Sequence, residues 1–252
     1  MELEPWIYAA LVATGLLTGF IDAIAGGGGL IMMPALLSAG LPPHLALGTN
    51  KLQSSIGVAI ATWTYHGKGL LDIRANWLLV LCVLIASAAG SLAVQALDPD
   101  VLQLVVPVLL MLCAAYVLLS PRMDDHDRHH RLSHPAYAPV AGSIGFYDGF
   151  FGPGTGSFFT TSLVALRGMG LTRATALAKL FNFTSNFGAL LMFILGGKVI
   201  WMLGIAIGLG CMAGSWLGSH SAMRYGARLI RPLLVVISLA LTARLLWDYL
   251  AG

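Results

Sequence analysis

Two aspartates and two lysines lie within apolar stretches of this sequence, and their types are suited to chemistry inside a membrane. They are Asp22, Lys51, Asp148 and Lys179. A charge at the centre of a span costs about 2.5–3.5 kcal/mol on insertion scales, so such residues are candidates for function. A buried carboxylate released from its partner binds a proton more readily, which would couple transport to protons. Alternatively, each aspartate caps the glycine-rich turn after it or neutralises a nearby lysine. Both roles remain open.

Each lysine is followed by uncharged polar residues at helical spacing. Lys51 is followed by Ser54 and Ser55, at i+3 and i+4. Lys179 is followed by Asn182 and Asn186, at i+3 and i+7. An ammonium beside amides and hydroxyls suits a small oxyanion, because these groups satisfy its oxygen lone pairs. A single lysine near a span end more often snorkels to the interface. The recurrence in two related copies favours anion binding.

Glycine-rich breaks follow both aspartates, at Gly26–Gly29 and at 152–156. Helices that begin near Leu30 and Ser157 would point unpaired N–H groups and a positive helix end of about half a charge toward a cavity. Pro153 suits a turn, and Thr155 adds a hydroxyl. The alternative is close helix packing through small residues, which explains many of the 30 glycines, such as Gly90, Gly214 and Gly218. It explains four consecutive glycines less well.

The elements that position these residues must lie in lipid. Of the 252 residues, 58% are hydrophobic and 10% are charged, whereas soluble domains carry about 25% charged residues. The composition and the net charge of +3 exclude a soluble enzyme, a nucleic-acid binder and a disordered chain. We therefore expect an all-α polytopic membrane protein. Cys82, Cys113 and Cys211 match no ligand spacing and are expected to be small core residues.

A membrane span takes about 20 apolar residues. The sequence contains eight candidates, at 6–24, 44–65, 76–96, 101–119, 137–151, 174–195, 199–219 and 229–250. Two further apolar pieces, 30–39 and 157–166, are too short to span and are expected to be re-entrant. Broken helices at matching positions of two repeats are typical of a midplane site in a secondary transporter. The breaks are expected to line a cavity, because unsatisfied backbone in lipid is costly.

The two halves of the chain repeat each other. Gly19–Asp22 returns as Gly145–Asp148, the motif at 46–52 returns at 174–180, and Gly90 matches Gly214. We expect a first transmembrane repeat at 1–120, a polar histidine-rich loop at 121–136 and a second repeat at 137–252. Four spans per half make the repeats parallel, and a crossing by the short piece makes them inverted. The sequence leaves this open.

The central loop contains histidines among aspartates: His126, His129, His130 and His134. Metal binding or pH sensing is one interpretation. A solvated connector is favoured, because no cysteine joins the cluster and nothing orders its geometry.

Five motifs resemble the TauE/SafE sulfite-exporter family, particularly its YfcA-like branch. They are GFIDAIAGGGGL (19–30), GTNKLQ (48–53), GFYDGFFGPGTGSF (145–158), ATALAKLFNFTSN (174–186) and FILGGKVIW (193–201). The resemblance covers nearly the whole chain. It implies a bacterial inner-membrane permease with a four-span duplication that moves sulfite, sulfonates or related organosulfur anions. The family's motif positions carry over to Asp22, Gly26–Gly29, Asn50, Lys51, Asp148, Gly152, Gly154, Lys179 and Asn182.

Residues and resemblance together predict a secondary anion transporter that is not an enzyme and has no cofactor or metal. Its partners are a small anion and the lipid bilayer, with no nucleic acid, and a homodimer is one alternative for its assembly. The proton-coupling residues are predicted to be Asp22 and Asp148. The predicted substrate-binding residues are Lys51, Lys179, Asn50, Gly27, Gly28, Gly29, Ser54, Gly152, Gly154, Thr155, Asn182 and Asn186.

Two other functions remain as alternatives. An intramembrane aspartyl protease would use Asp22 and Asp148 as a dyad, although the order of the accompanying motifs is wrong for it. A passive anion channel would share the site and lack an occluded state.

Overall fold

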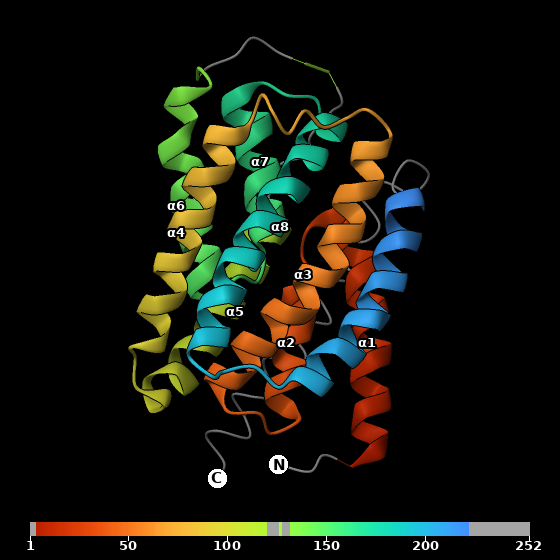
Figure 1. The fold of residues 1–252 in the computed structure, drawn as a ribbon, viewed down its shortest axis with the longest axis vertical. Helices are drawn as coiled ribbons and strands as arrows, with labels where there is room; N and C mark the ends of the chain where they lie inside the picture. The colour runs from red at the N-terminus through yellow and green to blue at the C-terminus, as the bar shows by residue number, and fades with distance from the viewer. Residues whose placement is uncertain (1–3, 120–125, 128–131, 222–252) are drawn as a thin grey trace.

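The computed structural model describes residues 4–119, 126–127 and 132–221, and this part of the chain is helical (Figure 1). Its helices are α1 (Pro5–Ala25), α2 (Gly29–Ser38), α3 (Pro43–Gly67), α4 (Trp77–Gln95), α5 (Pro99–Leu119), the short 3-10 helix η1 (Pro135–Tyr137), α6 (Ala138–Phe150), α7 (Thr155–Arg167), α8 (Leu171–Leu195) and a further helix, Trp201–Ser221. The all-α prediction is confirmed for these residues.

Glycines with positive φ produce the two predicted breaks. Helix α1 ends at Gly26, whose φ is 75°, and α7 begins after Gly154, whose φ is 86°. Glycine adopts this left-handed conformation without steric cost, whereas other residues rarely do. The pieces that follow the breaks are short, with 10 residues in α2 and 13 in α7. Each break therefore joins two helices into a hairpin.

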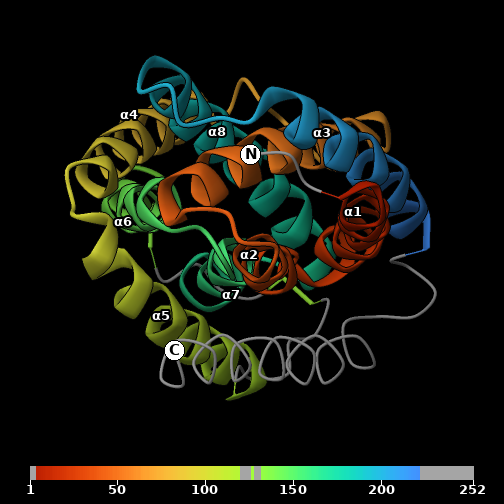
Figure 2. The same cartoon turned by 90° about the horizontal axis from the view of Figure 1, so that it is seen from below.

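The two hairpins turn back toward opposite ends of the molecule. In Figure 1 the α1–α2 pair returns to the end where the chain begins, and the α6–α7 pair returns to the other end. The long helices that follow them, α3 and α8, run in opposite directions. In the view from below, α2 and α7 lie between α1 on one side and α5 and α6 on the other (Figure 2).

Helices of the two halves pack together through glycine. A Cβ at Gly90 on α4 would lie 2.0 Å from the carbonyl oxygen of Phe146 on α6. In the same way, a Cβ at Gly214 would lie 1.9 Å from the carbonyl oxygen of Leu16 on α1, and Gly218 lies against Phe20. The packing interpretation of these glycines is thus confirmed, and each hairpin is held by a helix of the other half.

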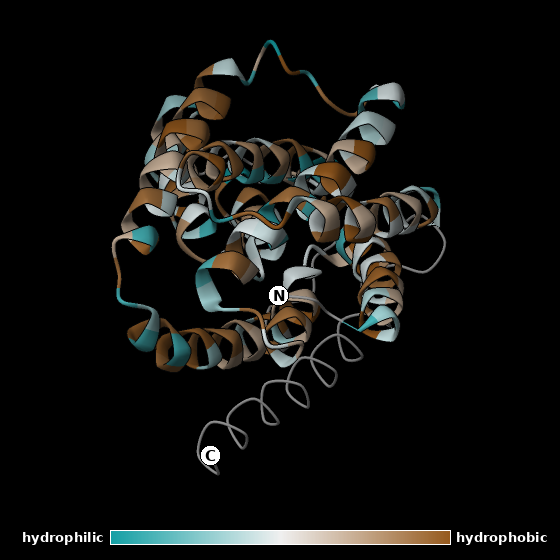
Figure 3. Ribbon diagram, turned by 60° about the horizontal axis from the view of Figure 1, so that its bottom comes forward, coloured by the Kyte–Doolittle hydropathy of each residue, from teal (hydrophilic) through white to brown (hydrophobic). Residues whose placement is uncertain are grey.

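The outer helices carry the surface expected in lipid. Hydrophobic residues cover much of them, with hydrophilic residues at helix ends and connections (Figure 3). Tryptophans near helix ends are exposed, as belts at a membrane interface require: Trp6, Trp63, Trp77 and Trp201. Five described helices are long and apolar enough to cross a membrane: Pro5–Ala25, Trp77–Gln95, Pro99–Val117, Leu171–Leu195 and Trp201–Ser221. The chain is a multi-pass membrane protein.

The span predictions need one correction. The stretch 137–151 forms the 13-residue helix α6, which is too short to cross a bilayer alone, because the break at 151–154 ends it. Helix α3 has 25 residues, but the polar residues of its first half make it less apolar than a typical span. The predicted span 229–250 lies outside the described residues.

Within the described residues no group of histidine, cysteine or acidic side chains could hold a metal ion. His129 and His130 of the central loop lie outside that part of the chain. In the described part, His134 Nδ1 lies 3.4 Å from Arg167 Nη2.

Candidate functional site

The two glycine breaks cross each other in direct backbone contact. A Cβ at Gly156 would lie 2.6 Å from Cα of Gly26, and one at Gly29 would lie 3.2 Å from Cα of Pro153. Ser157 joins the breaks, because its N–H donates to the carbonyl of Gly26 at 3.1 Å and its hydroxyl donates to that of Ala25 at 2.7 Å. Only glycines permit so close an approach.

This crossing corrects one prediction about the helix ends. The N–H groups of Leu30 and Ser157 were expected to point unpaired into the cavity. Instead, Leu30 donates to the carbonyl of Gly27 at 3.0 Å, and Ser157 donates to Gly26 and Gly154. The tight turns before α2 and α7 satisfy these donors, and the opposite break supplies a second acceptor for Ser157.

We expect Gly156→Ala to destabilise the protein by about 1–3 kcal/mol, because its methyl group would enter the backbone of the other hairpin. Gly142→Ala is the matched control, since its Cβ would lie 4.0 Å from Ala86, an ordinary contact. The measurement is thermal unfolding of both purified variants in detergent. Equal melting temperatures for the two variants would contradict the crossing geometry.

The four intramembrane charges form two ion pairs, and each pair joins the two halves of the chain. Lys51 Nζ lies 2.9 Å from Asp148 Oδ1, and Lys179 Nζ lies 2.8 Å from Asp22 Oδ2. Each ammonium also donates to the backbone carbonyl of its aspartate. The lysines are 0% and 1% exposed, so the snorkelling interpretation is wrong for both. Pairing keeps these charges tolerable in the membrane interior.

The two aspartates have unequal environments. The Asp148 carboxylate accepts hydrogen bonds from Thr155 Oγ1 at 3.0 Å and from Ser185 Oγ, besides its lysine. Apart from its own lysine, the Asp22 carboxylate accepts one hydrogen bond, from Gly28 N at 3.3 Å. The side chain of Asp148 is 1% exposed and that of Asp22 is 14% exposed. Asp22 is therefore the less firmly held of the two carboxylates.

A small polar cavity lies between the crossed breaks and helices α3 and α8, and its volume is about 30 Å³. Most of the predicted site residues line it: Asp22, Gly28, Gly29, Asn50, Lys51, Ser54, Asp148, Gly152, Gly154, Thr155, Asn182 and Asn186. Gly27 and Lys179 are not among the lining residues. Lys179 is paired with Asp22, whose side chain does line the cavity. The volume admits one or two water molecules, so an oxyanion requires the helices to move apart.

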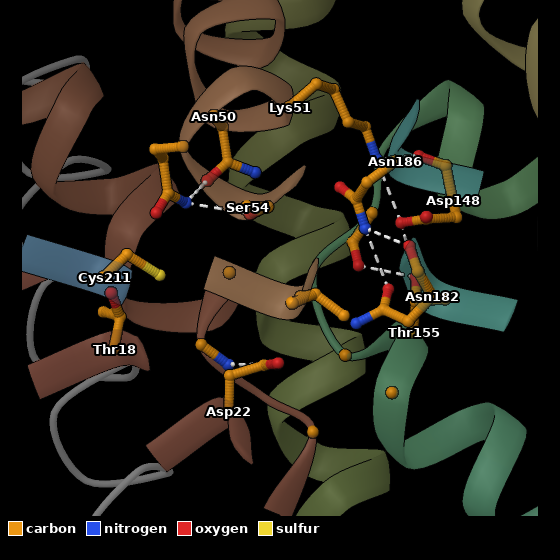
Figure 4. A pocket seen from close by; sticks show the side chains of 18 residues that line it. Thr18, Asp22, Asn50, Lys51, Ser54, Asp148, Thr155, Asn182, Asn186 and Cys211 are labelled. Carbon is orange, nitrogen blue, oxygen red and sulfur yellow. Dashed lines mark hydrogen bonds and ion pairs between the residues drawn. The ribbon is translucent and has the colours of Figure 1, made fainter. Parts of the chain in front are cut away.

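Amide side chains line the cavity from both halves. Gln53 Nε2 donates to Asn50 Oδ1 and to Ser54 Oγ, both at 2.8 Å. Asn186 Nδ2 donates to Asn182 Oδ1 at 2.9 Å. Figure 4 shows Asn50 and Ser54 on one side of the cavity and Asp148 and Thr155 on the other, with Asp22 apart from both.

Several residues that line the cavity were not predicted from the sequence, and one residue placed on the Lys51 face, Ser55, lies outside the lining. The missed residues are Thr18, Gly26 as a lining group, Gln53, Val58, Gly156 and Cys211. For Gln53 the signal was a polar residue within an apolar stretch, one helical turn after Asn50. Ser55 does not line the cavity, and its hydroxyl is buried without a partner in the described structure.

A protease dyad does not fit this geometry. Two aspartates that share a proton must lie side by side. Here each carboxylate is paired with its own lysine, and among the described residues no hydrogen bond joins the two. Figure 4 shows Asp22 and Asp148 at different parts of the cavity wall.

Interrupted helices that cross around a charged cavity in a multi-pass membrane protein are typical of membrane transporters. Comparison with known proteins identifies the family. A model of the sulfite exporter TauE/SafE family matches residues 11–245. The chain belongs to this family.

Curated relatives from bacteria match along almost their whole length. A protein of Haemophilus influenzae called "Probable membrane transporter protein" is 42% identical over 98% of this chain and 98% of its own. "Probable membrane transporter protein YfcA" of Escherichia coli strain K12 is 42% identical over 98% of this chain and 92% of its own. "Probable membrane transporter protein ORF9" of a Sinorhizobium species is 44% identical over 98% of this chain and 95% of its own. No solved structure matches the chain significantly.

Proposed function

We propose that this protein is a proton-coupled secondary transporter of a small anion, with sulfite, sulfonates or related organosulfur compounds as the substrate class. The observation that carries the proposal is the pair of buried Lys–Asp bridges beside one polar cavity. The name of the family, sulfite exporter, supports the substrate class. The bacterial relatives support a place in the bacterial inner membrane.

The charge balance of the site supports coupling to protons. Two lysines and two aspartates sum to zero, and the described lining residues include no other charged side chain. An anion that enters alone adds a negative charge in a region of low dielectric constant, which is costly. If Asp22 takes up a proton, it releases Lys179, and the anion replaces the carboxylate as the partner of this ammonium. One anion and one proton then enter together without a change in net charge.

We further propose that the two halves are inverted repeats, with residues 1–120 and 137–252 as the repeat units around the central loop. The opposite directions of α3 and α8 and of the two hairpins support this arrangement (Figure 1). In such transporters the substrate lies where the broken helices of the repeats meet, and the repeats rock to expose it on alternate sides. The crossing of Gly26 and Gly156 is the corresponding place here.

The test of the function is transport of sulfite and small sulfonates into liposomes that contain the purified protein. We expect replacement of both Lys51 and Lys179 by Ala to reduce uptake at least about tenfold, because each ammonium is worth more than 1.4 kcal/mol to a desolvated anion. Lys68→Ala is the control, since Lys68 lies at the end of α3 outside the cavity lining.

Unchanged uptake in the double variant would overturn the proposal. An imposed proton gradient distinguishes the channel alternative, because only a coupled transporter accumulates the anion against its own gradient.

A further inference from the structure

Gln53 carries a buried hydrogen-bond acceptor that the described structure leaves without a partner. The side chain is 2% exposed, it lines the cavity, and its amide nitrogen is fully occupied by Asn50 and Ser54. No hydrogen bond reaches its Oε1 from any described residue. A buried acceptor without a donor is unfavourable, so the position is suited to a ligand that supplies one.

Amides on both sides of the cavity also present donors. The amide nitrogens of Asn50 and Asn182 make no hydrogen bond to any described residue, while the oxygens of both side chains accept one. If oxygen and nitrogen are interchanged in the side-chain amides of both Asn50 and Gln53, the hydrogen bond between the two residues is kept. The unpaired acceptor then belongs to Asn50 and the unpaired donor to Gln53. In either orientation the pair, which lines the cavity, holds one acceptor and one donor without a partner among the described residues.

Asn50 and Ser54 lie apart from both ion pairs of the cavity. In Figure 4 they are on the side opposite Asp148 and Thr155, and Asp22, the partner of Lys179, lies apart from them as well. An anionic group that replaces Asp22 beside Lys179 therefore leaves the rest of a ligand to reach the Asn50–Gln53 pair. An apolar end there would leave the acceptor unsatisfied.

Resting on the proposed function, we propose that the substrate carries a hydrogen-bond donor as well as anionic oxygens, and that Gln53 recognises this donor. The donor is the hydroxyl of a protonated oxyanion such as hydrogen sulfite, the hydroxyl of a hydroxyalkane sulfonate, or the ammonium of an aminoalkane sulfonate. A sulfonate with only an alkyl group is rejected. Gln53 is thus a specificity residue, distinct from the charged groups that hold the anion.

The experiment measures binding of three sulfonates of nearly equal size to the purified full-length protein in detergent by calorimetry. Isethionate carries a hydroxyl, taurine carries an ammonium, and ethanesulfonate carries neither. We expect isethionate or taurine, or both, to bind at least about tenfold more tightly than ethanesulfonate. Isethionate and taurine distinguish the two kinds of donor from each other. Sulfite tests the protonated oxyanion, if its binding weakens with pH more steeply than that of ethanesulfonate, which remains ionised.

Gln53→Met should lower the affinity for the donor-bearing sulfonate about tenfold and leave ethanesulfonate within about twofold. Gln103→Met is the control, because Gln103 is exposed on α5 and does not line the cavity. Equal affinities of the wild-type protein for all three sulfonates would overturn the inference, while the proposed function would stand. If the Gln53 variant fails to fold, the affinities of the wild-type protein for the three sulfonates alone decide whether the inference holds. Absence of binding by every anion would instead overturn the proposed function, and the inference with it.

Discussion

Replacing Lys51 by Met is expected to lower the free energy of unfolding by about 3–5 kcal/mol, because it leaves the carboxylate of Asp148 buried without its counter-charge. The side chains of this pair are each 1% exposed, so water cannot substitute for the lost ammonium. Adding Asp148→Asn should restore most of the stability, since the double variant buries no unpaired charge. The measurement is a double-mutant cycle of chemical or thermal unfolding in detergent.

The chain contains a matched control for this cycle. Arg173 and Asp127 also form an ion pair, but their side chains are 60% and 50% exposed. Arg173→Met should therefore change stability by no more than about 1 kcal/mol. A Lys51→Met effect as small as that of Arg173→Met would contradict the role assigned to the buried bridge. So would a double variant less stable than the single one.

If each anion enters with one proton, as proposed, anion binding is expected to weaken about tenfold for each unit of pH increase. The direction of this change in affinity with pH follows from the charge balance of the site. Raising the pH removes the proton that Asp22 needs to release Lys179, so the unliganded bridge becomes the more stable state. A sulfonate is the suitable probe, since it remains ionised throughout this range, and the dissociation constant is measured between pH 6 and 8.

Asp22→Asn should abolish this pH dependence, because an amide is uncharged at every pH and takes up no proton when the anion binds. The variant should also lose accumulation driven by a proton gradient while it retains exchange of labelled for unlabelled anion. Asp72→Asn is the control, as Asp72 is exposed between α3 and α4. A flat pH profile in the wild-type protein, or an unchanged profile in Asp22→Asn, would contradict coupling through Asp22. Dependence on Asp148 instead would assign the proton to the other carboxylate.

The helical fold class was predictable from the sequence, because lipid permits few polar residues and demands helices of about 20 residues. The positions of α1, α4, α5 and α8 follow directly from apolar stretches. Helix α6 was predicted as a span and is not long enough to be one, since a break that reverses the chain has no hydropathy signal. The same limitation left parallel and inverted repeats undecided.

The order of residues is enough to show which residues carry charge inside the membrane, that they occur in two related sets, and that glycine breaks follow the aspartates. Their partners become known only from the packed helices. Each lysine pairs with the aspartate of the other half, Ser157 bonds to the opposite break, and Gln53 holds an unpaired acceptor at the cavity wall. Spacing along one helix fixes which side chains share a face. It carries no information about which face of a distant helix they meet, because that depends on how the two crossed hairpins pack.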